Sequence, residues 1–150
     1  MLCIWWGVKG VIYLELFPKN KTVNATRYRD QINKLVTEVI NKEFFSGKIY
    51  FRHDNARPYK AEIVKDRITK LGWELQPYQS YSPDLAASNY HLFCTLGNDL
   101  KGRKFENEEE IKRYLQDFFD SKSKEFYTRG IRDLPRRWVE VIDSNGEYIR

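Results

Sequence analysis

Asp54 and Asn89 are the two residues whose type and position suggest chemistry. Asp54 directly follows a short β-forming segment, and Asn89 lies at the start of an apolar helical segment, with 34 residues between them. Two-metal nucleases hold two Mg²⁺ ions about 4 Å apart between carboxylates from different strands and helices, and the ions activate water and stabilise the leaving oxygen. Asp54 suits such a site, whereas the amide oxygen of Asn89 coordinates weakly and does not neutralise a cation.

The segments that would position these residues alternate between strand and helix. Runs of β-forming residues predict four strands, at residues 1–6, 11–17, 48–52 and 73–77. Apolar residues at helical spacing predict five helices, at 24–43, at 61–71, from Ser88, after Asn107, and at 133–143. This order, after an opening hairpin, predicts a single α/β domain over residues 1–150. Ligands in such sheets bind where strands end, which is where Asp54 lies.

The helix that carries Asn89 is predicted to turn this side chain toward the sheet. Asn89 shares a face with Leu92, Phe93 and Leu96 if the spacing is that of an α-helix. Ser88 is suited to cap this helix, and Asn107 followed by Glu110 resembles a capping box for the next one. Residues 79–87 are expected to form a loop.

The remaining reactive side chains favour structural interpretations. Cys3 and Cys94 lack the spacing of a zinc or disulfide framework, so we expect reduced, mostly buried thiols. His53 and His91 have no nucleophile motif beside them, which disfavours an acid–base pair. The apolar segment 1–6 is too short to span a membrane. We therefore expect a nuclear or cytosolic protein with no membrane partner and no small-molecule cofactor.

Composition and charge exclude several classes and favour an anionic partner. With 41% hydrophobic and 31% charged residues, the chain is typical of neither disordered nor membrane proteins. The net charge is +5, but residues 19–70 alone hold 13 Lys/Arg against 6 Asp/Glu. Arg52, Arg57 and Lys60 flank Asp54, and this basic rim predicts sequence-independent contact with a phosphate backbone. A solvated helix face is the alternative interpretation.

Several motifs in order resemble mariner-type (Tc1/mariner) transposases. They are His53-Asp-Asn-Ala-Arg-Pro58, Tyr81-Ser-Pro-Asp-Leu-Ala86, Tyr90-His-Leu-Phe93, Gly130-Ile-Arg-Asp-Leu-Pro135 with Arg137-Trp138, and Asp143-Ser-Asn-Gly-Glu-Tyr148. The first residues, Met1-Leu-Cys-Ile-Trp-Trp6, are similar to that family too. The resemblance covers essentially the whole chain.

The resemblance implies a ribonuclease-H-like (retroviral-integrase-like) mixed sheet with flanking helices and an acidic triad that binds two Mg²⁺ or Mn²⁺ ions. The second triad position falls on Asp54 and the third on Asn89, where an active transposase has Asp. The first triad Asp and its central strand are expected upstream of Met1, as are the helix-turn-helix modules that read transposon ends.

The same resemblance sets the functional expectations. With one of three carboxylates left, we expect metal to bind weakly or not at all and the chain to be a catalytically inactive remnant with residual non-specific DNA binding. A domesticated DNA-binding or protein-interaction module is one alternative, and a metal-dependent endonuclease completed by upstream sequence is another. DNA and a second copy of the chain are the expected partners.

The strands that flank the missing central strand present a fold problem. Either segment 1–6 pairs directly with segment 48–52, or uncovered apolar edges leave the domain marginally stable and prone to pair with another chain.

Overall fold

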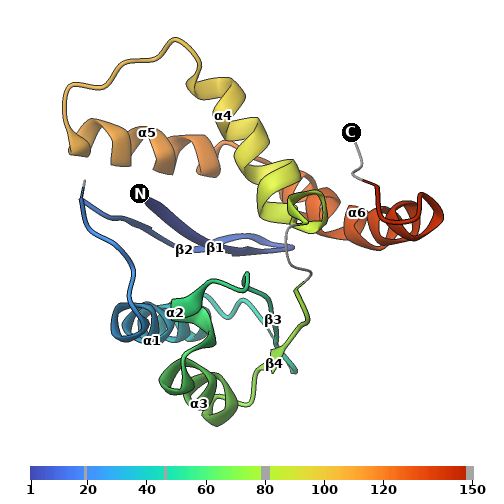
Figure 1. Ribbon diagram of the computed structural model, residues 1–150. Helices are drawn as coiled ribbons and strands as arrows, with labels where there is room; N and C mark the ends of the chain where they lie inside the picture. The colour runs from blue at the N-terminus through green and yellow to red at the C-terminus, as the bar shows by residue number, and fades with distance from the viewer. Residues whose placement is uncertain (19, 46, 79–81, 148–150) are drawn as a thin grey trace. The chain divides into compact units, whose positions relative to one another are not determined.

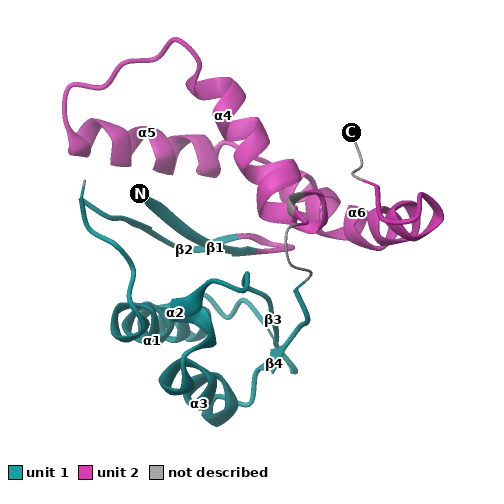
Figure 2. Ribbon diagram, in the orientation of Figure 1, with its two compact units in different colours: residues 1–6, 11–80 teal, residues 7–10, 81–150 magenta. Residues whose placement is uncertain are grey.

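The computed structural model describes residues 1–18, 20–45, 47–78 and 82–147, which form two compact units. Unit 1 comprises Met1–Trp6 with Val11–Ser80, and unit 2 comprises Gly7–Gly10 with Tyr81–Arg150 (Figure 2). The strands and helices are shown in Figure 1. No helix among the described residues is long and apolar enough to cross a membrane.

The predicted hairpin is confirmed as β1 (Leu2–Gly7) and β2 (Gly10–Leu16). Reciprocal backbone hydrogen bonds between Met1 and Phe17, of 2.7 and 3.0 Å, close its open end. Gly10 has φ +129°, a conformation that side-chain-bearing residues rarely adopt, so the turn into β2 needs a glycine.

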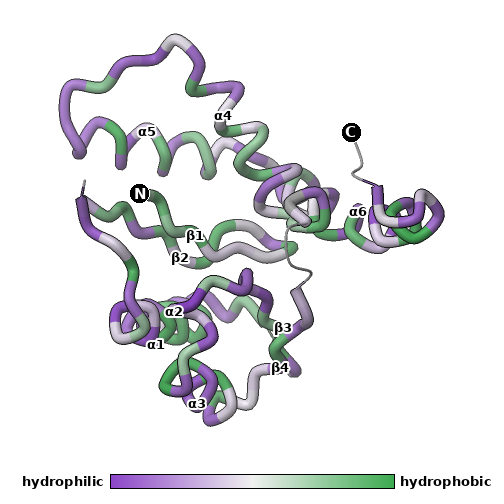
Figure 3. The backbone as a smooth tube through the Cα atoms, in the orientation of Figure 1, coloured by the Kyte–Doolittle hydropathy of each residue, from purple (hydrophilic) through white to green (hydrophobic). Residues whose placement is uncertain are grey.

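The main helix of unit 1, α1 (Ala25–Asn41), begins and ends close to the predicted bounds. The side chain of Asn24 accepts a hydrogen bond from the Arg27 N–H at 2.8 Å and caps the first turn. Tyr28, Ile32 and Leu35 lie at helical spacing and are buried in the core of the unit. The apolar side of α1 therefore packs with Ile12 of β2 and with Phe51 in one core. Figure 3 shows hydrophobic and hydrophilic residues interspersed along the chain of this unit.

The second pair of strands is shorter than predicted. β3 (Tyr50–Phe51) and β4 (Glu74–Leu75) pair in parallel, with Tyr50 opposite Glu74 and Phe51 opposite Leu75. The predicted helix 61–71 is present as α3 (Glu62–Lys70), whereas the short helix α2 (Arg57–Lys60) was not predicted. Pro58 lies in its first turn, a position where the missing N–H of proline costs nothing.

Direct pairing of segment 1–6 with segment 48–52 is not observed. Within the described residues, strands pair as β1–β2 and β3–β4, in separate two-stranded sheets. Of the two alternatives, closure of segment 1–6 onto segment 48–52 is therefore wrong, and marginal stability stays a prediction.

Unit 2 is mostly helical. Its elements are the 3₁₀ turn Pro83–Leu85, the π-helical turn Ser88–Phe93, α4 (Cys94–Leu100), α5 (Glu108–Asp120) and α6 (Lys124–Asp143). Asn107 caps α5 as predicted, accepting from the Glu110 N–H at 2.9 Å. The predicted loop 79–87 lies partly outside the described residues, since 79–81 are not among them.

Three other expectations are wrong, those for Ser88 and the last helix in unit 2 and that for the two cysteines. Ser88 lies inside the helical turn and does not cap it, because the helical backbone already includes Ala87. α6 begins at Lys124 and not at Asp133, because Ser123 provides the N-cap and Pro135 is accommodated inside the helix. Cys94 is exposed and Cys3 is half-buried, so neither thiol is a core residue.

Candidate functional site

Asp54 lies in an exposed turn directly after β3. Its Oδ1 accepts a hydrogen bond from the Ala56 N–H at 2.8 Å, the local side-chain-to-backbone bond that favours Asp in turns. The next residue, Asn55, donates from Nδ2 to the Tyr78 carbonyl at 2.9 Å and so ties the turn to the chain beyond β4. The carboxylate is therefore held at the end of the parallel pair, at the position that sequence reasoning identified.

His53, immediately before Asp54, lies among aromatic rings. Its Nδ1 is 2.8 Å from the Tyr28 hydroxyl, its ring stacks on Tyr59 at 5.3 Å between centroids, and Phe51 contacts it edge-on. Burial lowers the pKa of His53 to about 4, although the negative charge of Asp54 acts in the opposite direction. The imidazole is neutral at pH 7, and its contacts with Tyr28, Tyr59 and Phe51 support the turn.

The charge of Asp54 also acts on the tyrosines of unit 1. Burial raises the pKa of Tyr59 to about 12, and the neighbouring Asp54 carboxylate adds to this rise. The pKa of Tyr78 is also raised, mainly by burial and to a smaller extent by the charge of Asp54. Asp54 therefore stands beside neutral side chains that stay uncharged at physiological pH.

The basic residues predicted to contact phosphate all lie in unit 1. The Arg52 guanidinium is 5.1 Å from the centroid of the Tyr78 ring, a cation–π contact that fixes its direction. Arg57 and Lys60 are exposed on α2, three residues apart and so on one side of this short helix. All three cations lie within six residues of Asp54 in the chain.

Asn89 is exposed, contrary to the prediction that it faces the sheet. Leu92 and Leu96 on the same segment are buried, as expected. The difference arises because Ser88–Phe93 is a π-helical turn, which holds more residues per turn than an α-helix and so rotates Asn89 away from the Leu92 face. Asp54 lies in unit 1 and Asn89 lies in unit 2.

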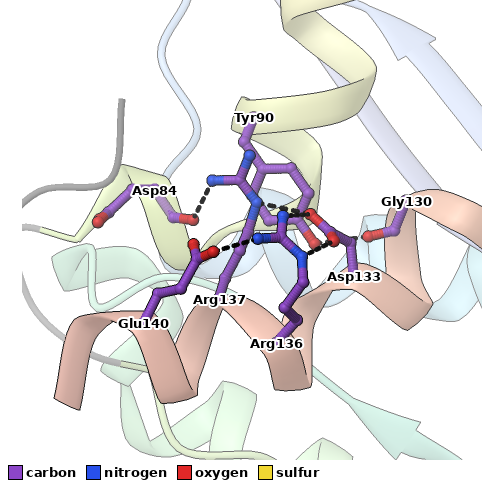
Figure 4. Close-up of polar contacts among 7 residues, drawn as sticks. All are labelled: Asp84, Tyr90, Gly130, Asp133, Arg136, Arg137 and Glu140. Atoms are coloured by element: carbon purple, nitrogen blue, oxygen red, sulfur yellow. Dashed lines mark hydrogen bonds and ion pairs between the residues drawn. The ribbon is translucent and has the colours of Figure 1, made fainter. Parts of the chain in front are cut away.

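Sequence reasoning missed the residues that hold the Asn89 turn. Figure 4 shows Arg137 of α6 stacked on Tyr90, 3.8 Å from its ring centroid, and donating from Nη1 to the Asp84 carbonyl at 3.2 Å. Arg137 Nε also donates to Asp133 Oδ2 at 2.8 Å. Hydrogen bonds from Arg136 and then Arg137 lower the pKa of Asp133, which stays ionised. Gly130–Pro135 and Arg137 were noticed as motif residues, but nothing in a linear pattern indicates this contact.

The donor set of the described residues does not fit a two-cation centre. Within ranges 1–18, 20–45, 47–78 and 82–147, no group of three or more His, Cys, Asp or Glu residues could hold a metal. Asp54 offers one negative charge, and one of its oxygens already accepts a backbone N–H, while Asn89 offers a neutral amide. Two divalent cations require more anionic oxygen than this.

Comparison with known sequences identifies transposases. A family described as "Transposase (partial DDE domain)" matches residues 1–45. Over 99% of its length, the chain is 41% identical to the Mariner Mos1 transposase of Drosophila mauritiana and 35% identical to the histone-lysine N-methyltransferase SETMAR of Homo sapiens. The chain spans 44% and 22% of the lengths of these two relatives.

Solved structures give the same result at the level of the fold. The Mos1 transposase catalytic domain with raltegravir and Mn superposes with a TM-score of 0.96 at 41% identity, covering 99% of this chain and 76% of that chain. A Mos1 paired-end complex with the left transposon end superposes equally well, at 42% identity over 99% of this chain and 44% of that chain.

Proposed function

This chain belongs to the mariner transposase family, within its catalytic domain, and on that basis we propose that it binds DNA without sequence specificity and has lost metal-dependent cleavage. Its fold class is the ribonuclease-H-like one that the motifs implied. We further propose that both compact units belong to this one catalytic domain.

The observation that carries the DNA-binding proposal is the basic rim, three cations within six residues of Asp54, of which Arg57 and Lys60 are exposed and Arg52 is half-buried. Arg57 and Lys60 project from α2 into solvent, and Arg52 stacks on Tyr78 beside the same turn. Cations that neutralise backbone phosphates release condensed counterions, which gives sequence-independent affinity. A relative of known structure is described as a complex with a transposon end, which supports DNA as the partner class here.

The loss of cleavage is argued from Asn89. Related structures contain Mn or Mg, so divalent metal is used in this family. We propose that Asp54 and Asn89 occupy two of its metal positions. Because an amide carries no charge, a cation at Asn89 loses the neutralisation that a carboxylate would give, and the reaction loses most of the rate that positioned metal supplies. Any metal bound would polarise water or a phosphate oxygen.

DNA binding is tested by its salt dependence. If three cations contact phosphates, the logarithm of affinity should fall against the logarithm of salt concentration with a slope of about 2.7. The double change Arg57→Ala and Lys60→Ala should reduce this slope by about 1.8, whereas the charge-matched pair Lys101→Ala and Lys104→Ala in unit 2 should leave it unchanged. A slope that is the same for both variants would remove the assignment to this rim.

Cleavage is tested by nicking of supercoiled DNA with Mg²⁺ or Mn²⁺. The purified chain should give no product above a metal-free control. Cleavage that disappears in Asp54→Ala would instead support the alternative of an active nuclease. Mn²⁺ binding followed by electron paramagnetic resonance should strengthen in Asn89→Asp, which restores a charge, and not in Asn89→Gln.

A further inference from the structure

One face of α6 contacts the turn that carries Asn89 at successive positions. Phe126, Gly130, Asp133 and Arg137 lie at i, i+4, i+7 and i+11, so they form a single stripe along the helix. Three of them, Phe126, Gly130 and Arg137, contact residues 84–91 directly, and the fourth, Asp133, holds Arg137 in place. Figure 4 draws Gly130, Asp133 and Arg137 together with Asp84 and Tyr90.

The contacts at the start of this stripe involve His91. Its Nε2 donates to the Phe126 carbonyl at 2.7 Å, and its ring lies 4.3 Å from the Phe126 ring. A Cβ atom at position 130 would come within 2.9 Å of His91 Cγ, so the helix can approach this ring only with glycine at that position. The Tyr90 hydroxyl donates to the Gly130 carbonyl at 2.5 Å.

The contacts at the other end involve Arg137. Its guanidinium covers the Tyr90 ring, and it donates to Asp133 and to the Asp84 carbonyl, while its side chain is only 17% exposed. Tyr90 is thereby held from both sides, through its ring and its hydroxyl. The two residues that follow Asn89 are thus fixed to α6, whatever the local helical preference.

We infer that this stripe is a clamp that keeps Ser88–Phe93 in a π-helical turn, and that Arg137 and Tyr90 are positioning residues for position 89. α-helical spacing would place Asn89 on the buried face with Leu92 and Leu96, whereas the clamped turn leaves it exposed. Releasing the clamp should let the turn relax to α-helical spacing. Because Leu92 and Leu96 are anchored in the core, the segment before them rotates and takes residue 89 toward the interior.

The clamp would decide whether the side chain at position 89 is exposed to a ligand. The inference rests on the proposed function only for the role of Asn89 at a metal position. The test uses neither DNA nor metal. In the full chain with Cys3→Ala and Cys94→Ser, the single thiol of Asn89→Cys is titrated with an aromatic disulfide reagent. An exposed thiol reacts faster than a buried one.

Adding Arg137→Ala should lower the reactivity of the position-89 thiol by roughly threefold or more, since losing hydrogen bonds to a charged group shifts an equilibrium by about tenfold. Arg132→Ala is the matched control, because Arg132 is exposed on the same helix and, in the part of the chain described, has no hydrogen bond or ring contact to the turn. Tyr90→Phe should show a smaller decrease in the same direction.

Reactivity that is unchanged in Arg137→Ala would overturn the inference. An increase would also overturn it, because an increase indicates general loosening and not a change of helical register. If circular dichroism shows that Arg137→Ala does not fold, Tyr90→Phe and Arg137→Lys are used in its place. Reactivity of the position-89 thiol that does not decrease in these variants would overturn the inference. A failure of DNA binding or of metal binding leaves this readout unaffected.

Discussion

The turn at Asp54 and the turn at Asn89 are held in place by different kinds of contact. Asp54 itself is fixed locally, through its own bond to the Ala56 N–H, while its neighbours His53 and Asn55 contact Tyr28 and Tyr78, which lie 25 and 23 positions away. The turn at Asn89 is fixed by α6, through residues 35 to 53 positions away. The Asp54 carboxylate should therefore tolerate changes elsewhere in the chain better than Asn89, whose turn depends on α6.

The largest effect should come from Gly130→Ala. The added methyl group meets the His91 ring, so the helix and the turn must separate, and the chain should lose about 1–3 kcal/mol of stability. Gly97→Ala in α4 is the control, since nothing lies within 4 Å of a Cβ there and alanine should stabilise that helix by up to about 1 kcal/mol. Urea unfolding of both variants checks this, and equal midpoints would mean that the close approach of α6 does not matter.

The next effect concerns pH and the aromatic setting of His53. Its pKa is about 4 in the folded chain and about 6.5 unfolded, so between these values the unfolded state binds more protons. Stability is therefore complete above about pH 6.5 and falls as pH decreases toward 4. The loss should reach about 2 kcal/mol, because partial solvent access to the ring offsets some of the desolvation.

The pH measurement is made without divalent ions by urea unfolding, with His53→Gln as the variant that should remove this part of the slope. The same slope in the variant and in the parent chain would assign the pH dependence to other groups.

A smaller effect is expected from Asp54→Ala. The change removes the acceptor for the Ala56 N–H and should cost about 1 kcal/mol, whereas Asp54→Asn keeps an acceptor oxygen and should cost less. Hydrogen exchange should show the loss confined to residues near the turn in unit 1. Faster exchange at residues 88–93 would contradict the local character of this turn.

The smallest effect is expected from Arg129→Ala. Arg129 pairs with Glu125 at 3.5 Å, but both side chains are more than 70% exposed, so the change should cost at most about 0.5 kcal/mol. Thermal unfolding of Arg129→Ala and of Arg137→Ala, measured side by side, would compare the solvent-exposed face of α6 with the face that forms the clamp. A large loss of stability in Arg129→Ala would show that burial does not explain the difference between the two faces.

Local patterns predicted much of unit 1. Residue type and spacing predicted the hairpin, α1 and the two strands near Asp54, although β3 and β4 are shorter than expected. The parallel pairing of β3 with β4 and the Asn24 cap were not predicted. The helix α2 was missed because four residues are too few for periodicity to register.

Unit 2 departed further from its sequence pattern, for identifiable reasons. α6 begins nine residues before its predicted start, because Ser123 caps the helix upstream of Gly130, a residue type that locally disfavours a helix. Asn89 was predicted to lie on the buried face because a 3.6-residue period does not detect a π-helical turn. Cys94 was expected to be buried from its residue type alone, but it is exposed.

The sequence by itself determined the family, the position of Asp54 after a strand, and the presence of an amide at position 89, because motifs and residue identities are local properties. Only the tertiary structure decided which way position 89 faces and which residues hold it there. The physical reason is that the direction of Asn89 depends on contacts between segments about 40 residues apart, made by a helix face whose partner no local pattern specifies.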